Sequence, residues 1–313
     1  MGLFSSLFGG KKSPEEEQNK NFDILKYDGI RAMRIGKLTY AIKCLLEASH
    51  LKEDEETLQH LAKCYVHTNQ MEEAKKVLTQ RAAIMPNEPE AFLSLAQVCF
   101  MLEDYEAMAE ACQKALALNE KLPAAYYLMA QAMHGKKDMI QTIVMLTKTL
   151  AIEPEAVEAL QMRAQVLWEM RQANDALTDV EQLLALNADD ETALLLKGEI
   201  SATQDAQSEM AMKCFNTVLS LNPFNEKAYL LKGGFLALQN KLDEAIAVFD
   251  EAIELNPQLA SAYQERGRVK LLKGDKEGSL EDMKKVMEIN PDQAANLSGE
   301  YNNYDHLKKN VPF

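Results

Sequence analysis

His60, Cys64 and His67 have the side chains and the spacing of metal ligands. They are four and three residues apart, so on a helix all three would lie on one face. Imidazole nitrogen and thiolate sulfur suit Zn²⁺, but a structural zinc site takes four such ligands. No fourth ligand is evident, so we interpret the three as ordinary helix residues and predict no metal site and no cofactor.

Other patterns that carry out chemistry are also missing from the sequence. It contains no Gly-rich phosphate loop and no Gly-x-Ser-x-Gly nucleophile turn. The acidic pairs Glu15/Glu17 and Glu53/Glu56 fall in a predicted linker and a predicted turn, where water solvates them, whereas an acid/base pair needs a perturbed pKa and a fixed geometry. We therefore predict no catalytic residue and no enzymatic activity.

Composition favours an all-α protein with an acidic surface. Hydrophobic residues make up 47% of the 313 residues and aromatic residues only 7%, and the abundant residue types are good helix formers. The formal net charge of -14 repels phosphate backbones, so nucleic acid is not an expected partner.

The cysteines and the hydropathy pattern bear on the compartment. The five cysteines are scattered and form no Cys-x-x-Cys pair, so we expect reduced thiols in a cytoplasmic protein. Cys99 and Cys112 would face each other across a helical hairpin, either as neighbouring thiols or as two small core residues. No run of eighteen apolar residues is present to span a membrane.

The elements that carry these residues repeat along the chain. Ala228–Pro257 and Ala262–Pro291 share an opening Ala-Tyr, a Gly four residues after the Tyr, and a closing Asn-Pro. The period is 34 residues, and it divides the chain into eight repeats: 22–54, 55–88, 89–122, 123–156, 157–190, 191–225, 226–259 and 260–293. The sixth is one residue longer, which we place in the turn near Thr203–Ser208.

This period resembles the tetratricopeptide repeat family, in which each repeat is a helix-turn-helix. Position 8 is small throughout: Gly29, Ala62, Ala96, Ala130, Ala164, Gly198, Gly233 and Gly267. Small residues there let two antiparallel helices approach closely, and Pro near position 32 in five repeats ends the second helix. The resemblance implies a right-handed superhelical solenoid of about eight repeats over residues 22–293, with one continuous core.

The two ends of the chain differ from the repeats. Residues 294–313 are predicted to form a partial capping helix and a tail. Residues 1–21 are predicted to be a flexible segment with a short apolar patch (Leu3, Phe4, Leu7 and Phe8), followed by Lys11-Lys12 and an acidic linker from Pro14 to Lys20. Three roles remain open for the patch: weak contact with a membrane surface, docking into a groove of this chain or of a partner, or none.

In the tetratricopeptide family, ligands usually lie in the concave groove lined by positions 2, 5, 9 and 12 of each first helix. Position 9 is Gln in three successive repeats, and position 12 beside it is aromatic or His. Amides can bond the backbone of an extended peptide, and aromatic side chains supply hot-spot contacts. The alternative is that Gln is a soluble helix former and the rings fill gaps between repeats. The predicted binding residues are Gln97, Phe100, Tyr127, Gln131, His134, Gln161, Gln165 and Trp168.

The sequence therefore favours a scaffold or adaptor that binds a peptide or protein partner in this groove. The alternative is a membrane-peripheral assembly factor anchored through residues 3–8, with the repeats as its platform.

Overall fold

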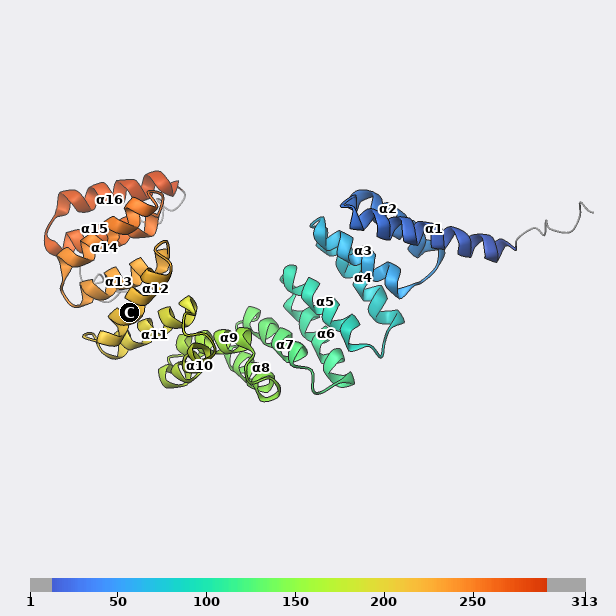
Figure 1. Cartoon of the computed structure of the whole chain (residues 1–313), viewed down its shortest axis with the longest axis horizontal. Helices are drawn as coiled ribbons and strands as arrows, with labels where there is room; N and C mark the ends of the chain where they lie inside the picture. Colours follow the sequence, from blue (N-terminus) through green and yellow to red (C-terminus); the bar gives the residue numbers. More distant parts are fainter. Residues whose placement is uncertain (1–12, 292–313) are drawn as a thin grey trace, which may run out of the picture. The chain divides into compact units, whose positions relative to one another are not determined.

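The computed structural model describes residues 13–291, and all the long regular elements in that range are α-helices (Figure 1). The predicted all-α repeat fold is confirmed, because each of the eight repeats contains two consecutive helices. The helices are α1 (Pro14–Arg34), α2 (Leu38–Leu51), α3 (Glu55–His67), α4 (Met71–Ile84), α5 (Pro89–Met101), α6 (Tyr105–Leu118), α7 (Pro123–Gly135), α8 (Met139–Ile152), α9 (Val157–Glu169), α10 (Ala173–Leu186), α11 (Glu191–Gln204), α12 (Glu209–Leu221), α13 (Glu226–Leu238), α14 (Leu242–Leu255), α15 (Ala260–Lys273) and α16 (Lys276–Ile289).

The chain divides into two compact units, Met1–Ala159 and Leu160–Phe313. Helices α1 to α8 belong to the first unit and α10 to α16 to the second, while α9 begins in the first and continues in the second. In each unit the two helices of a repeat pack against each other, and the second helix of one repeat packs against the first helix of the next, as α5, α6 and α7 do.

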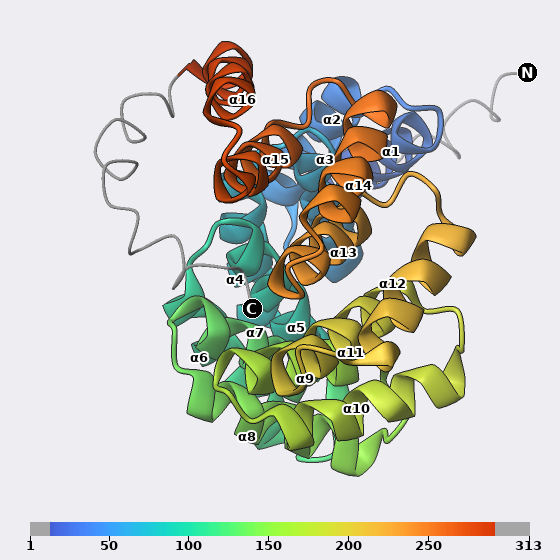
Figure 2. The ribbon, with the colours of Figure 1, turned by 90° about the vertical axis from the view of Figure 1, so that its left-hand side faces the viewer.

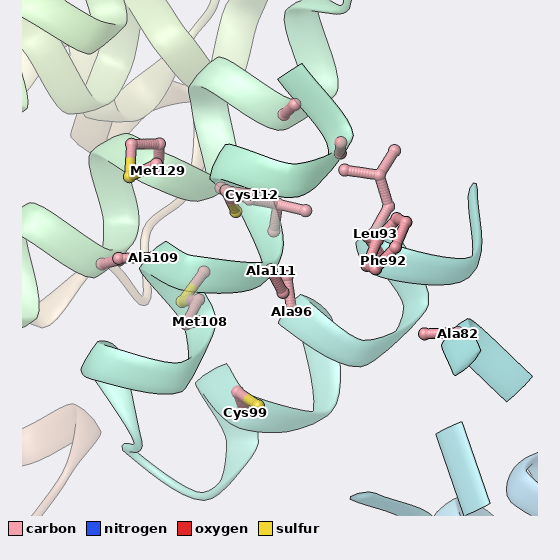
Figure 3. Close-up of a cluster of buried hydrophobic side chains, with 14 of the residues drawn as sticks. Ala82, Phe92, Leu93, Ala96, Cys99, Met108, Ala109, Ala111, Cys112 and Met129 are labelled. Atoms are coloured by element: carbon pink, nitrogen blue, oxygen red, sulfur yellow. The ribbon is translucent and has the colours of Figure 1, made fainter. Parts of the chain in front are cut away.

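The core of the first unit shows how these contacts are filled. Phe92 and Ala96 of α5, Met108 and Cys112 of α6, and Met129 of α7 are buried in one cluster (Figure 3). The cluster mixes alanines with larger side chains, so the small residues let the helices approach closely and the larger ones fill the space between them.

Position 8 sets how closely the two helices of a repeat approach. A Cβ atom on Gly198 would lie 2.6 Å from Cε1 of Phe215, and one on Gly233 would lie 2.5 Å from Cε1 of Phe249. Both phenylalanines are fully buried. Figure 2 shows α13 and α14, which carry Gly233 and Phe249, packed side by side. The glycine therefore makes room for the ring across the hairpin, as the small-residue pattern predicts.

The turn between the two helices of a repeat has a left-handed residue at position 15. The same position has a positive φ in seven repeats, at Gly36, Asn69, Glu103, Lys137, Arg171, Asn240 and Gly274. In the fourth repeat the N–H of Asp138 bonds to the carbonyl of Met133 at 2.9 Å and the N–H of Lys137 to that of His134 at 2.8 Å, the pair of bonds that defines a Schellman motif. In the sixth repeat, whose extra residue extends this connection, Asp205 has a φ of -143°.

Lys137→Gly is expected to raise the free energy of unfolding by up to about 1 kcal/mol, because a left-handed conformation costs a lysine more than a glycine. Urea denaturation measures the change. Gln141→Gly is the matched control: Gln141 lies exposed inside α8, so it should lower stability by roughly 0.5–1 kcal/mol. Equal losses from both variants would contradict the assignment of strain to Lys137.

Helix α1 begins at Pro14, whereas the sequence pattern predicted a flexible linker over residues 14–20. Ser13 Oγ accepts a hydrogen bond from the N–H of Glu16 at 3.1 Å, and the Glu16 carboxylate accepts one from the N–H of Ser13 at 3.0 Å. These two bonds form a capping box, and acidic side chains are favourable in the first turn of a helix. The acidic run therefore starts a helix. The apolar patch at residues 3–8 and the predicted capping helix at 294–301 lie outside the described residues.

Candidate functional site

Five of the predicted binding residues lie on two neighbouring helices of the first unit. Gln97 and Phe100 are one turn apart on α5, and Tyr127, Gln131 and His134 follow one another at three- and four-residue spacing on α7. Helices α5 and α7, the first helices of the third and fourth repeats, pack against each other (Figure 1). We call these five residues the first-helix face.

The α5 part of this face is open to solvent. Phe100 is 42% exposed, so its ring is accessible to a ligand. Gln97 beside it is exposed, and its amide has no hydrogen-bond partner within residues 13–291. The two side chains can therefore contact a ligand without giving up a bond inside the protein.

The α7 part is half-buried and polar. Burial raises the pKa of the Tyr127 hydroxyl, the carboxylate of Glu158 adds to the rise, and a hydrogen bond with Gln131 opposes it. Tyr127 therefore stays neutral, with a hydroxyl that donates and accepts hydrogen bonds. His134 is also half-buried.

The other three predicted residues lie on α9, in the second unit, and each already has a partner. Gln161 donates a hydrogen bond to Asp190 at 3.2 Å, and Gln165 donates one to Glu169 at 3.0 Å. The indole N–H of Trp168 donates to Glu199 at 3.3 Å.

Trp168 has a second contact, because the guanidinium carbon of Arg171 lies 6.0 Å from the centroid of its ring. A ligand that used these α9 side chains would have to replace contacts that the protein already makes.

Sequence reasoning missed Met101, which follows Phe100 and is 54% exposed. It occupies position 13, where the neighbouring repeats have His67 and Gly135. A large apolar residue between two repeats that have a polar or small residue at this position was the available signal, although Leu238 and Leu272 occupy it in the last two repeats. Together Phe100 and Met101 give the end of α5 two exposed apolar side chains.

The three residues with metal-ligand spacing do not share one surface. Cys64 is fully buried, His67 is exposed, and His60 is half-buried with a buried Nδ1 that lacks a hydrogen-bond partner. Burial lowers the pKa of His60, and the nearby charge of Lys63 lowers it further. Within residues 13–291, no three His, Cys, Asp or Glu side chains are placed to hold a metal ion.

Cys99 and Cys112 are both fully buried in the core of the third repeat. Burial raises the pKa of the Cys112 thiol to about 12, with a contribution from Cys99, and burial likewise raises the pKa of Cys99. Because the thiolate is the reactive form, both side chains act as small core residues at neutral pH.

The chain is similar to known proteins in the segments that form these repeats. Residues 89–122, 162–209 and 260–293 match families described as tetratricopeptide repeat, and residues 236–274 match one described as TPR repeat. Over 103 residues the chain is 34% identical to Tetratricopeptide repeat protein 17 of Homo sapiens and 33% identical to that of Mus musculus. The match covers 32% of this chain and only 9% of those proteins. The chain belongs to the tetratricopeptide repeat family.

Solved structures share the fold at low sequence identity. The C-terminal part of a TPR repeat-containing protein from Cytophaga hutchinsonii matches with a TM-score of 0.64 and 13% identity, covering 77% of this chain and 98% of that one. A tetratricopeptide repeat protein from Parabacteroides merdae matches with a TM-score of 0.53 and 17% identity, covering 93% and 97%. PilW, a type IV pilus biogenesis factor, matches with a TM-score of 0.57 and 18% identity, covering 65% and 94%. At these identities the matches support the fold alone.

None of the described helices is both long and apolar enough to cross a membrane.

Proposed function

We propose that this protein is a non-enzymatic scaffold that binds an extended peptide segment of a partner protein on the first-helix face. The observation that carries the proposal is the exposed Phe100 beside the unpaired amide of Gln97 on α5. An exposed aromatic ring next to an amide without an internal partner is well suited to a peptide, because the ring supplies area to bury and the amide can bond the peptide backbone.

The spacing of the helices fits an extended chain. Packed helices lie about 8–10 Å apart, and three residues of an extended peptide span about 10 Å. One peptide can therefore contact Gln97 on α5 and Gln131 on α7 with anchor residues three apart. Phe100 and His134 lie one turn further along the same two helices and form a second row of contacts.

Gln161, Gln165 and Trp168 form a separate and weaker candidate on the second unit. Each would exchange a bond to Asp190, Glu169 or Glu199 for a bond to the ligand. Exchanging one hydrogen bond for another changes the binding free energy only by the difference between the two bonds. It therefore contributes less to affinity than a new bond does.

The charge and the thiols restrict the partner and the compartment. A net charge of -14 disfavours nucleic acid and acidic peptides, so we expect neutral or basic peptide ligands. The five cysteines are free thiols, a state typical of a reducing compartment. We therefore assign the scaffold to the cytoplasm.

Selection from a phage-displayed library of random peptides tests the proposal whichever protein the partner is. Peptides enriched on the intact protein are expected to be lost when selection is repeated on a Phe100→Ala, Gln131→Ala variant. They should be retained on a Phe224→Ala, Gln141→Ala control, which removes an exposed phenylalanine and an exposed glutamine outside the first-helix face. Equal enrichment on both variants would place the binding site elsewhere.

A further inference from the structure

The first unit has a cavity of about 320 Å³ that is lined by residues of α2, α3 and α4. Its inner wall is apolar and includes Leu58, Leu61 and Val77, and His50 and Gln80 are polar residues of its lining. This volume is at the lower end of the range of about 300–1,000 Å³ found for sites that bury small ligands. It accommodates a few large apolar side chains. We call it the α2–α4 cavity.

Tyr65 gives this cavity a polar group that lacks a partner. Its side chain lines the cavity and is 7% exposed, and within residues 13–291 its hydroxyl has no hydrogen-bond partner. At the same position, position 11, the next three repeats have Cys99, Met133 and Leu167. The fold of the repeat therefore does not require a hydroxyl there. The hydroxyl is therefore available to donate a hydrogen bond to an occupant of the cavity.

The chain itself supplies an apolar segment at the end of the cavity. The Gln18 amide in the first half of α1 donates a hydrogen bond to the carbonyl of Leu51 at 3.0 Å. Leu51 directly follows the cavity residue His50 in the sequence. Helix α1 begins at Pro14, only about 6 Å of helix before Gln18 at 1.5 Å per residue. The described part of the chain therefore begins close to the cavity.

The length and charge of residues 1–12 also fit. From Ser13 back to Leu3, an extended chain reaches about 33 Å at 3.3 Å per residue, enough to turn back and enter the cavity. Glu53 lines the cavity, is exposed, and has no ion-pair partner in the described range. Lys11 and Lys12 complement that carboxylate.

We propose that the N-terminal segment of this chain docks in the α2–α4 cavity, with the apolar side chains of Leu3, Phe4, Leu7 and Phe8 filling it. A backbone carbonyl of the segment or the hydroxyl of Ser5 or Ser6 accepts the hydrogen bond of Tyr65.

A second apolar surface lies near the same end of the chain but fits the segment less well. Ile24, Tyr27 and Tyr40 are 49%, 57% and 54% exposed. Water can reach side chains that are half exposed. A flat surface also buries less of each inserted side chain than a cavity does.

Photo-crosslinking in the full-length protein tests the docking. With p-benzoylphenylalanine in place of Phe8, irradiation at high dilution is expected to join residue 8 to peptides of α2 and α4, as identified by mass spectrometry. Gln80→Trp introduces a bulky side chain at the cavity lining and should abolish most of this product. Thr79→Trp, at an exposed neighbouring position that does not line the cavity, should leave it unchanged.

Each other outcome overturns the proposal. A crosslink to Ile24, Tyr27 or Tyr40 would place the segment on the flat surface, and a crosslink between two chains would make a second copy the acceptor. Absence of a crosslink, or equal yields from the two tryptophan variants, would show that the segment does not dock in the α2–α4 cavity. Flotation with phosphatidylcholine/phosphatidylserine vesicles is expected to be the same with and without residues 1–12, and flotation that depends on them would make a lipid surface the acceptor.

Discussion

Replacing Arg163 with methionine is expected to lower the free energy of unfolding by about 3–5 kcal/mol, because it leaves a buried carboxylate without its counter-charge. Asp179 is 1% exposed. Arg163 donates two hydrogen bonds to it, from Nε at 2.8 Å and from a terminal guanidinium nitrogen at 2.6 Å. Methionine keeps much of the side-chain volume, so the change removes mainly the charge and its hydrogen bonds. Urea denaturation of the intact protein measures the loss.

Two further variants separate the buried charge from lost packing. Arg163→Met combined with Asp179→Leu should recover most of the stability, because replacing both members of a buried ion pair by apolar residues is often neutral or stabilising. Lys136→Met, which removes the exposed ion pair with Glu106 (2.7 Å), should cost less than about 1 kcal/mol. A double variant as unstable as the single one would show that packing, and not the unpaired carboxylate, accounts for the effect.

Gly233→Ala is expected to lower the free energy of unfolding by about 1–3 kcal/mol, the usual cost of overpacking a core. The added Cβ would lie 2.5 Å from two ring carbons of Phe249, and Phe249 is fully buried and cannot move aside cheaply. The change adds a single methyl group and introduces alanine, a better helix former than glycine. A loss of stability would therefore come from the contact across the hairpin. Thermal and urea unfolding both report it.

A double-mutant cycle with Phe249→Leu isolates that contact. In the leucine background the alanine should cost little, because the smaller side chain leaves space for the Cβ, so the two changes are strongly coupled. If Gly233→Ala costs the same in both backgrounds, the ring does not set the helix spacing in this repeat.

The sequence predicts the architecture well because the repeat frame is set by side-chain size at fixed positions. Small residues at position 8 and prolines near position 32 determine where the helices pack and end, and each recurs at its own position along the chain, so the sequence alone reveals them. The first helix was placed too late because the acidic run after Ser13 was interpreted as a solvated linker. Ser13 and Glu16 form a capping box, and their three-residue spacing is the signal that would have identified it.

The buried ion pairs were harder to predict, although they also follow the frame. Arg163 and Asp179 occupy positions 7 and 23 of the fifth repeat, and Arg266 and Asp282 occupy the same positions in the eighth. Arg266 donates to Asp282 at 3.0 and 2.6 Å. Two charged residues sixteen apart show no local pattern, so their pairing becomes visible only when the two helices of a repeat are packed together.

The candidate site was predicted only in outline. Counting positions identifies which residues lie on the first helices, but it does not show which side chains are already engaged. Gln161 and Trp168 bond to Asp190 and Glu199, which are 29 and 31 residues further along the chain. These contacts depend on side-chain rotamers and on the neighbouring helix. The structure therefore shifts the proposed site towards α5 and α7, where Gln97 has no such partner.

The central claim is that the first-helix face of α5 and α7 binds an extended peptide. The most direct test is the dissociation constant of one library-selected peptide, measured by isothermal titration calorimetry. We predict that binding to the Phe100→Ala, Gln131→Ala variant is weaker by roughly tenfold or more, since a hot-spot side chain contributes at least about 1–2 kcal/mol. The Phe224→Ala, Gln141→Ala control should bind like the intact protein. Equal dissociation constants for all three proteins would contradict the account.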